Sequence, residues 1–318
     1  MAINQKQIAE KLGVSIALVS RVLSGKAAEI GIASETIARV LATAEEMGYV
    51  PSAAALALKG KSTRTIGVTV YDFNDPFFGA LIKQIQMQAH EHNYSLVLAG
   101  FLNRVPNEQD LQALHKHALD GLIVIGTDLN AEWLNPFHGL PVARIGHGDP
   151  EEQSVRVTVD ERQSARLILE HLLASGRKKP TYICANLPAH QIRRQRFEQA
   201  AADLGIELPA QQFASGNAFE AGRQLATQCG SADALIGATD QVAMGALNAL
   251  HAAGIAVPEQ IVVTGFDDIP IAGQFVPGIT TLRQPIEQIV EEAFNAVLRP
   301  GKAKEIILPG TLVTRRTA

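Results

Sequence analysis

The residue types that most often support catalysis are present in this chain but are not spaced for it. His90 and His92, like His115 and His117, are two positions apart, which places the members of each pair on different faces of a helix and prevents shared metal ligation. No GxSxG, GxxxxGKS/T or HExxH motif occurs, and no GxGxxG follows a strand-like segment. We therefore expect no catalytic residues, no metal site and no cofactor, and the chain is not predicted to be an enzyme.

Recognition by exposed side chains is the chemistry indicated by residues 5–23, QKQIAEKLGVSIALVSRVL. The segment predicts two short helices joined by a turn, in which Gly13 supplies the turn geometry and Ser15 caps the second helix. Val19 and Val22 face inward on that helix. The outward residues are Ile16, Ala17, Ser20 and Arg21. This is the layout of a helix-turn-helix, whose second helix lies in the DNA major groove, although an ordinary helical hairpin has the same periodicity.

Further short motifs follow in order along nearly the whole chain. They are Val14-Ser15, Val19-Ser20-Arg21-Val22-Leu23, Glu45-Glu46-Met47-Gly48-Tyr49 with Pro51, Thr65-Ile66-Gly67-Val68, Asp75-Pro76-Phe77-Phe78, Asp120-Gly121-Leu122-Ile123, Val159-Asp160, Gly265-Phe266-Asp267-Asp268 and Thr280-Thr281-Leu282-Arg283-Gln284-Pro285. Each motif is weak alone, but the ordered set resembles the lactose-repressor (LacI/GalR) class of bacterial transcription regulators. The resemblance implies a helix-turn-helix head, a hinge helix, and a periplasmic-binding-protein-like α/β body of two doubly wound parallel-sheet subdomains.

The resemblance also implies how the head meets double-stranded operator DNA. The predicted DNA-binding residues are Ser15, Ile16, Ala17, Ser20, Arg21, Leu58 and Lys6. Ile16 and Ala17 suit contacts with thymine methyl groups, and Arg21 suits a guanine. Leu58 matches the hinge leucine that wedges into the minor groove, the alternative being an Ala-rich linker without a DNA role. Two heads on a roughly palindromic site require a homodimer.

The sequence departs from the family pattern at several positions, which affects the operator sequence that the head is expected to recognise. Leu18 stands where the family usually has Thr on the second helix, and Ser52 and Leu56 replace the usual Asn and Arg of the hinge. The segment before the third helix, LSGKAAEIGIASET, is a few residues longer than usual. That third helix is expected to begin with Ser34 as its N-cap and to end at Gly48.

Composition sets limits that agree with this interpretation. At 318 residues, 47% hydrophobic and 19% charged, the chain fits a globular protein of two or three domains. It has no apolar run near the ~20 residues of a membrane span, no signal-peptide h-region in MAINQKQ, and two cysteines expected to stay reduced, so a cytoplasmic location without a membrane is predicted. Net charge is −4, but residues 1–64 hold eight Lys or Arg against five Glu, which suits a basic DNA-contacting head.

The sequence pattern changes along the chain and predicts three segments. Residues 1–50 are the predicted helix-turn-helix head and 51–62 the hinge helix or linker, which is too short to be stable alone. Residues 63–318 are the predicted body, where short β-branched strands alternate with helices and the series restarts after Asp160. One subdomain is expected at about 63–160 plus 286–302, and the other at about 161–285 plus 303–318.

Ligands of doubly wound folds bind beyond the carboxyl ends of the strands, and the family resemblance names candidate residues there. They are Phe77, Asp75, Arg193, Asp267, Thr239 and His147. Phe77 is expected to stack on the ligand, with core packing as the alternative for both Phe77 and Phe78. Arg193 offers a planar fork of donors for hydroxyls or a carboxylate. Asp240 is as readily a helix cap as a ligand contact.

The predicted function is an effector-controlled transcription regulator, most simply a repressor. Thr239 stands where the family commonly has Asn, and Gly146 where it often has Asp, so the pocket loses an acidic acceptor. This favours a sugar acid weakly over a neutral sugar as the effector. The alternative function is a sugar-binding module of an uptake system, which the head and the missing signal peptide disfavour. The sequence does not determine the effector, whether it induces or corepresses, the operator, or whether the assembly is a dimer or a tetramer.

Overall fold

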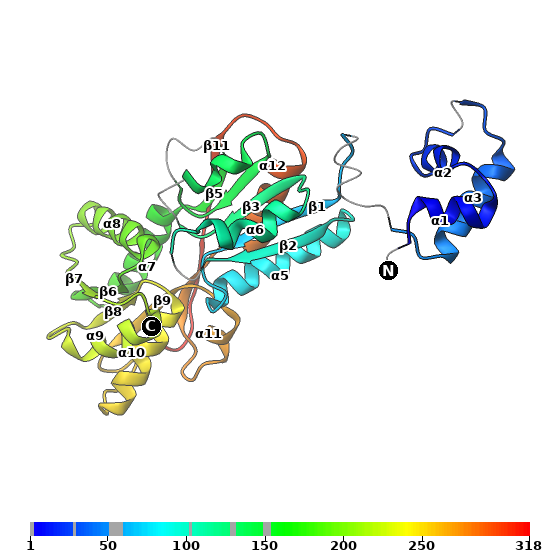
Figure 1. The fold of residues 1–318 in the computed structure, drawn as a ribbon. Coiled ribbons are helices and arrows are strands. Elements are labelled where there is room, and N and C mark those ends of the chain that lie inside the picture. Colours follow the sequence, from blue (N-terminus) through cyan, green and yellow to red (C-terminus); the bar gives the residue numbers. More distant parts are fainter. Residues whose placement is uncertain (1–2, 28–29, 51–59, 102–103, 128–131, 149–153) are drawn as a thin grey trace. The chain divides into compact units, whose positions relative to one another are not determined.

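The computed structural model describes residues 3–27, 30–50, 60–101, 104–127, 132–148 and 154–318. The chain divides into two compact units, Met1–Thr63 and Arg64–Ala318, which we call the head and the body (Figure 1). Leu58 and most of the expected hinge helix lie outside the described residues.

The head contains three helices, α1 (Gln5–Leu12), α2 (Ile16–Leu23) and α3 (Ser34–Glu46). Asn4 and Gln7 form a capping box at the start of α1, and Gly13 ends it in the left-handed conformation that glycine favours (φ 67°). The expected N-cap of α3 is wrong: Ser34 is the first helical residue and Ala33 precedes it without a side-chain cap. Buried side chains from all three helices and from Ala27 close one small core.

The first subdomain of the body is built on a six-stranded sheet. In spatial order its strands are β11 (Lys304–Leu308), β5 (Val155–Val159), β4 (Val142–Ile145), β3 (Gly121–Ile125), β1 (Thr65–Val70) and β2 (Ser95–Gly100), all parallel to their neighbours. Its helices are α5 (Pro76–Glu91), α6 (Glu108–Lys116) and α12 (Ile286–Leu298). Residues Glu132–Phe137 form a 3-10 helix, η2.

The second subdomain is also built on a six-stranded sheet. Its strands in spatial order are β12 (Thr311–Val313), β10 (Thr280–Arg283), β9 (Val262–Asp267), β8 (Ala234–Gly237), β6 (Pro180–Ala185) and β7 (Ala210–Phe213). Only the β10–β12 pair is antiparallel among them. Its helices are α7 (Glu161–Ala174), α8 (Pro188–Asp203), α9 (Ala218–Leu225), η3 (Ala226–Gln228), α10 (Asp240–Ala252) and α11 (Pro270–Gln274).

Helices α9 and α10 approach each other more closely than side chains would allow. A Cβ at Gly222 would overlap the carbonyl oxygen of Val242, and a Cβ at Gly245 would overlap that of Phe219. Each helix therefore uses a glycine at the contact, so that the backbones of the two helices touch.

The chain passes between the subdomains three times, at 159–161, 283–286 and 308–311. Because β11 pairs with β5, residues 304–308 belong to the first sheet, and the expected assignment of all of 303–318 to the second subdomain is wrong for this strand. Helix α12 packs on α5 and on strands of the first sheet, as expected for residues 286–302. The two subdomains are thus interleaved in sequence, and loops after their strands meet at one cavity.

No helix in the described ranges is long and apolar enough to cross a membrane. Within those same ranges, no group of three or more His, Cys, Asp or Glu side chains is placed to hold a metal ion.

Candidate functional sites

The outer face of α2 carries the side chains that the sequence predicts for DNA contact. Ser15 caps the helix, because its Oγ accepts a hydrogen bond from the Leu18 N–H at 3.1 Å. Val19 and Val22 are buried in the head, as expected from the periodicity. Ile16 is 48% exposed, Ala17 and Arg21 are exposed, and Ser20 is half-buried. Helix α2 thus presents two apolar groups in its first turn and a guanidinium in its last turn.

Two lysines of the head lie outside α2. Lys6, on α1, is exposed and its Nζ lies 3.8 Å from a Glu10 carboxylate oxygen. Lys61 Nζ donates to the Ser24 carbonyl oxygen at 2.7 Å, which ties the end of the linker segment to the end of α2. Sequence analysis did not single out Lys61, since one lysine in a linker carries no spacing signal.

A cavity of about 500 Å³ in the body is lined by residues of both subdomains. The six predicted effector-binding residues, Phe77, Asp75, Arg193, Asp267, Thr239 and His147, all line it. They come from five separate places in the sequence, since only Asp75 and Phe77 are near neighbours, so the fold brings them together. Their contact with an effector stays a prediction.

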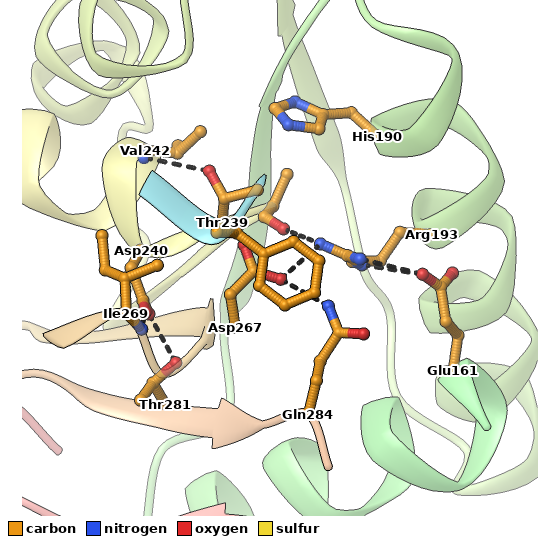
Figure 2. A network of polar contacts seen from close by, with 12 residues as sticks. Glu161, His190, Arg193, Thr239, Asp240, Val242, Asp267, Ile269, Thr281 and Gln284 are labelled. Carbon is orange, nitrogen blue, oxygen red and sulfur yellow. Dashed lines mark hydrogen bonds and ion pairs between the residues drawn. The ribbon is translucent and has the colours of Figure 1, made fainter. Parts of the chain in front are cut away.

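Arg193, on α8, is at the centre of a buried polar network (Figure 2). Its Nε and Nη2 donate to Glu161 Oε1 at 3.1 and 2.9 Å, and its Nη1 donates to the Ala238 carbonyl oxygen at 2.6 Å. The guanidinium also lies over the Phe266 ring, 3.7 Å from the centroid. Burial opposes ionisation of Glu161, but Arg193 and the nearby His147 more than offset it, so the pKa of that carboxyl lies below its usual range. Arg193 is therefore an arginine whose charge is matched within the protein.

Asp267, at the end of β9, lies on the other side of the Arg193 guanidinium (Figure 2). Its Oδ1 is 3.7 Å from Arg193 Nη1 and accepts a hydrogen bond from Gln284 Nε2 at 2.7 Å. Its φ of +111° is rare for a residue with a side chain, and such backbone strain is typical of binding sites. Burial raises the pKa of Asp267 well above its usual value, with Arg193 opposing the rise and Asp240 and Asp75 adding to it.

The first subdomain contributes a carboxylate and two aromatic rings at the start of α5. Asp75 caps the helix, with its Oδ1 accepting from the Phe77 N–H at 2.9 Å. Burial raises the pKa of Asp75, although the two amide groups at the helix start act against it. Phe77 is buried and belongs to the core, and Phe78 is half-buried; both line the cavity. Phe77 therefore belongs both to the core and to the wall of the cavity, and Phe78 belongs to the wall.

Three loop positions complete the wall. Thr239 caps α10 by accepting from the Val242 N–H. His147 follows β4, and its Nε2 lies 3.8 Å from Glu161 Oε2 across the subdomains. Gly146 has a φ of +114°, and a Cβ there would lie 2.9 Å from the Gly126 carbonyl oxygen, so this backbone excludes the aspartate that the family often has.

Three lining residues were missed by sequence analysis. Glu161 is the residue after the Val159-Asp160 motif, Gln284 lies inside another motif, and His190 begins α8. His190 Nδ1 accepts from the Ala185 N–H at 3.1 Å, and burial together with Arg193 lowers the pKa of His190 to about 3, so it is neutral. The available signal for Glu161 and Gln284 was position, since each lies within two residues of a strand end; His190 lies in the first turn of α8, without such a signal.

Two other aspartates that the sequence weighed are structural. Asp240 is fully buried at the first position of α10 and accepts from the Ile269 N–H and the Thr281 hydroxyl (Figure 2). Burial raises the pKa of Asp240 to about 7. Asp268 lies between Arg283 and Arg315, each 2.6 Å from one of its carboxylate oxygens, and does not cap a helix by its side chain.

Two family models match this chain, one within the head and one within the body. Residues 5–52 match the model for bacterial regulatory proteins of the lacI family, and residues 169–318 match a periplasmic binding protein-like domain. The chain is 30% identical over 329 residues to the HTH-type transcriptional regulator GalR of Escherichia coli (strain K12), covering 98% of this chain and 94% of that protein. It is 29% identical over 305 residues to the regulator AscG of the same organism, covering 92% and 90%.

Solved structures match over the whole chain. The Lac repressor dimer bound to operator and the anti-inducer ONPF superposes with a TM-score of 0.83 at 22% identity, covering 100% of this chain and 99% of that one. A complex of the transcriptional regulator CelR with cellobiose gives 0.68 at 22% identity, covering 99% and 100%. At these identities the matches show a shared fold.

Proposed function

Because this chain belongs to the LacI family of bacterial regulatory proteins, we propose that it represses transcription as a homodimer on a roughly palindromic operator. It is a DNA-binding transcriptional regulator controlled by a small-molecule effector. We assign the effector to the cavity of the body and the operator contacts to α2. Operator DNA lies in the bacterial cytoplasm, and we place the protein there.

The observation that carries this assignment is that both subdomains line one cavity. Asp75 and His147 belong to the first subdomain, and Arg193 and Asp267 to the second. A ligand that contacts both favours one relative orientation of the subdomains. It changes operator affinity by its differential affinity for the two orientations, since a ligand that binds both equally shifts nothing.

On the DNA side, the start of α2 supports direct reading of base edges. Ile16 and Ala17 suit thymine methyl groups, and Arg21 suits the two acceptors of guanine. Lys6 suits a phosphate, and Leu58 is proposed on its sequence match as the minor-groove wedge. An uptake module has no use for such a head. We propose no catalytic activity, because the described residues that line the cavity include no nucleophilic side chain paired with a base.

The lining of the cavity supports a polyhydroxylated ligand. Carboxylates, side-chain amides and threonines line the cavity together with the aromatic rings of Phe77 and Phe78, a combination typical of sites for sugars, whose rings have one apolar face. The weak preference for a sugar acid does not fit the geometry. That preference is based on the loss of an acidic acceptor at Gly146, whereas Glu161 supplies a carboxylate to the cavity and accepts from two donors of Arg193.

The test uses full-length protein. An operator is selected from random duplexes, and sugars are screened for those that raise the melting temperature. A ligand found in this way is expected to change operator affinity in fluorescence anisotropy, and Asp267→Asn is expected to reduce that change. A ligand that stabilises the protein strongly yet leaves operator affinity unaltered would contradict effector control through this cavity.

A further inference from the structure

The charges around the cavity are strongly unequal. Among the described lining residues, the carboxylates are Asp72, Asp75, Glu161 and Asp267, and Arg193 is the one arginine or lysine. His190 adds no charge, because burial lowers its pKa to about 3. A positive charge on His147, whose Nε2 lies 3.8 Å from Glu161 Oε2, would be matched by that carboxylate and would leave the other carboxylates in excess. A ligand entering this cavity meets an excess of negative charge.

The single arginine is already matched. Three of its donor bonds go to Glu161 and to the Ala238 carbonyl oxygen, and its guanidinium plane is covered by the Phe266 ring. Arg193 is only 6% exposed. An anionic ligand would therefore share Arg193 with Glu161 and add a further negative charge to a cavity in which carboxylates already outnumber cations, which is costly.

The cavity also has an unused acceptor. Glu161 is 6% exposed, and its Oε2 is buried without a hydrogen-bond donor among the described residues, while its Oε1 is held by Arg193. Buried acceptors are normally paired, so this atom is expected to receive a donor from a ligand. The cavity is therefore suited to a ligand that brings hydrogen-bond donors and positive charge rather than acceptors.

Two carboxylates face the cavity from opposite subdomains. Asp75 lies at the start of α5 in the first subdomain, and Asp267 at the end of β9 in the second. Burial raises the pKa of both, and Asp75 contributes to the rise at Asp267. Like charges in a poorly solvated space repel, so these two groups oppose closure of the cavity unless a cation or a proton lies between them.

We propose that the effector is a polyhydroxylated amine, such as an amino sugar, whose ammonium group is held between Asp75 and Asp267. This rests on the proposed function, because it takes the cavity as the effector site. The ammonium donates charge-assisted hydrogen bonds to both carboxylates and so links the two subdomains. The hydroxyls of the ligand supply the donor for Glu161 Oε2, and Phe77 and Phe78 cover its apolar face.

The test compares ligands that differ in charge but not in shape. The probes are three matched series that share the pyranose ring: D-glucosamine, D-glucose and D-glucuronate, then the corresponding galactose and mannose compounds. Binding to the full-length protein is measured by calorimetry and thermal shift at neutral pH. In at least one series the amine is expected to bind about tenfold or more tightly than the neutral sugar, as one charge-assisted hydrogen bond would give. The acid is expected not to bind.

Two variants locate the ammonium. Asp75→Asn and Asp267→Asn are each expected to weaken binding of the amine about tenfold more than they weaken binding of the neutral sugar. Both should fold, because asparagine caps helices as well as aspartate does and tolerates a positive φ. Glu259→Gln, at an exposed acidic residue that does not line the cavity, is the control and should leave both ligands unaffected.

The outcomes separate this proposal from the proposed function. Equal or tighter binding of neutral sugars or acids in all series, or no binding of any amine, overturns the amine proposal. If a neutral sugar binds as tightly as the amine or more tightly and still changes operator affinity, the amine proposal is wrong but effector control through the cavity stands. An amine that binds as expected without altering operator affinity would instead contradict the proposed function and leave the ligand assignment standing.

Discussion

The Arg193–Glu161 pair predicts a specific pattern of stability. Replacing Arg193→Met keeps an unbranched apolar stem but removes every hydrogen bond that the guanidinium donates to Glu161 and to the Ala238 carbonyl oxygen. Glu161, 6% exposed, is then left as a buried charge without its main partner. Breaking a buried pair in this way costs about 3–5 kcal/mol. For a domain of this size each kcal/mol lowers Tm by about 2–4 °C, so a fall of roughly 6–20 °C is expected.

The second substitution tests the cause. Glu161→Gln removes the uncompensated charge, so the double variant is expected to be more stable than Arg193→Met alone by about 1–3 kcal/mol, the usual size of coupling within one polar network. If the two substitutions acted only through lost packing, their destabilising effects would add, and the double variant would be less stable than Arg193→Met.

Calorimetry and urea unfolding, followed by circular dichroism on the full chain, measure the four stabilities of this cycle. Arg196→Met is the matched control: Arg196 is on the same helix but exposed, and its Nη1 contacts only the Gln199 side chain. Its effect should stay within about 0.5 kcal/mol. A double variant no more stable than Arg193→Met would refute the view that Arg193 compensates a buried charge.

Three further predictions concern the head and the second subdomain. Arg21→Ala should weaken operator binding by about 1–3 kcal/mol and random DNA little, whereas Lys6→Ala should weaken both alike, as gel-shift titrations on the two DNAs will show. The folded protein holds a proton on Asp240 between about pH 4 and pH 7 that the unfolded chain has released, so stability falls as pH rises through this window. Asp240→Asn should flatten that fall, measured by urea unfolding at pH 5.5 and pH 8. Gly245→Ala should cost about 1–3 kcal/mol by forcing α10 away from α9, while Gly79→Ala, where a Cβ meets nothing within 4 Å, should be neutral or stabilising in thermal melts.

Local patterns predicted the elements of this protein well, because caps, turns and apolar periodicity act within a few residues. Ser15 caps α2 as expected, and Val19 and Val22 are buried. Strand pairing depends on residues far apart in sequence, and so β11 was assigned to the wrong sheet. No local signal distinguishes an edge strand that joins one six-stranded sheet from one that joins the other.

The site shows the same contrast. Family resemblance led to Arg193 and Asp267, and both line the cavity. Glu161 was missed because the neighbouring Asp160 belongs to the motif, and only the orientation of the first turn of α7 decides which of the two carboxylates faces Arg193. The charge balance of the cavity, and with it the preference among effectors, follows from that orientation.

The three passages of the chain between the subdomains also constrain when this protein can acquire its binding site during synthesis. Neither sheet has all its strands until the last fifteen or so residues have been made, because β11 completes one and β12 the other. Thr317 and Ala318 then hydrogen-bond to Val263 and Thr280. The growing chain can therefore fold its head early, whereas the body must wait for its final segment to leave the ribosome. A newly made regulator would thus have a DNA-reading element before it has the means to sense an effector.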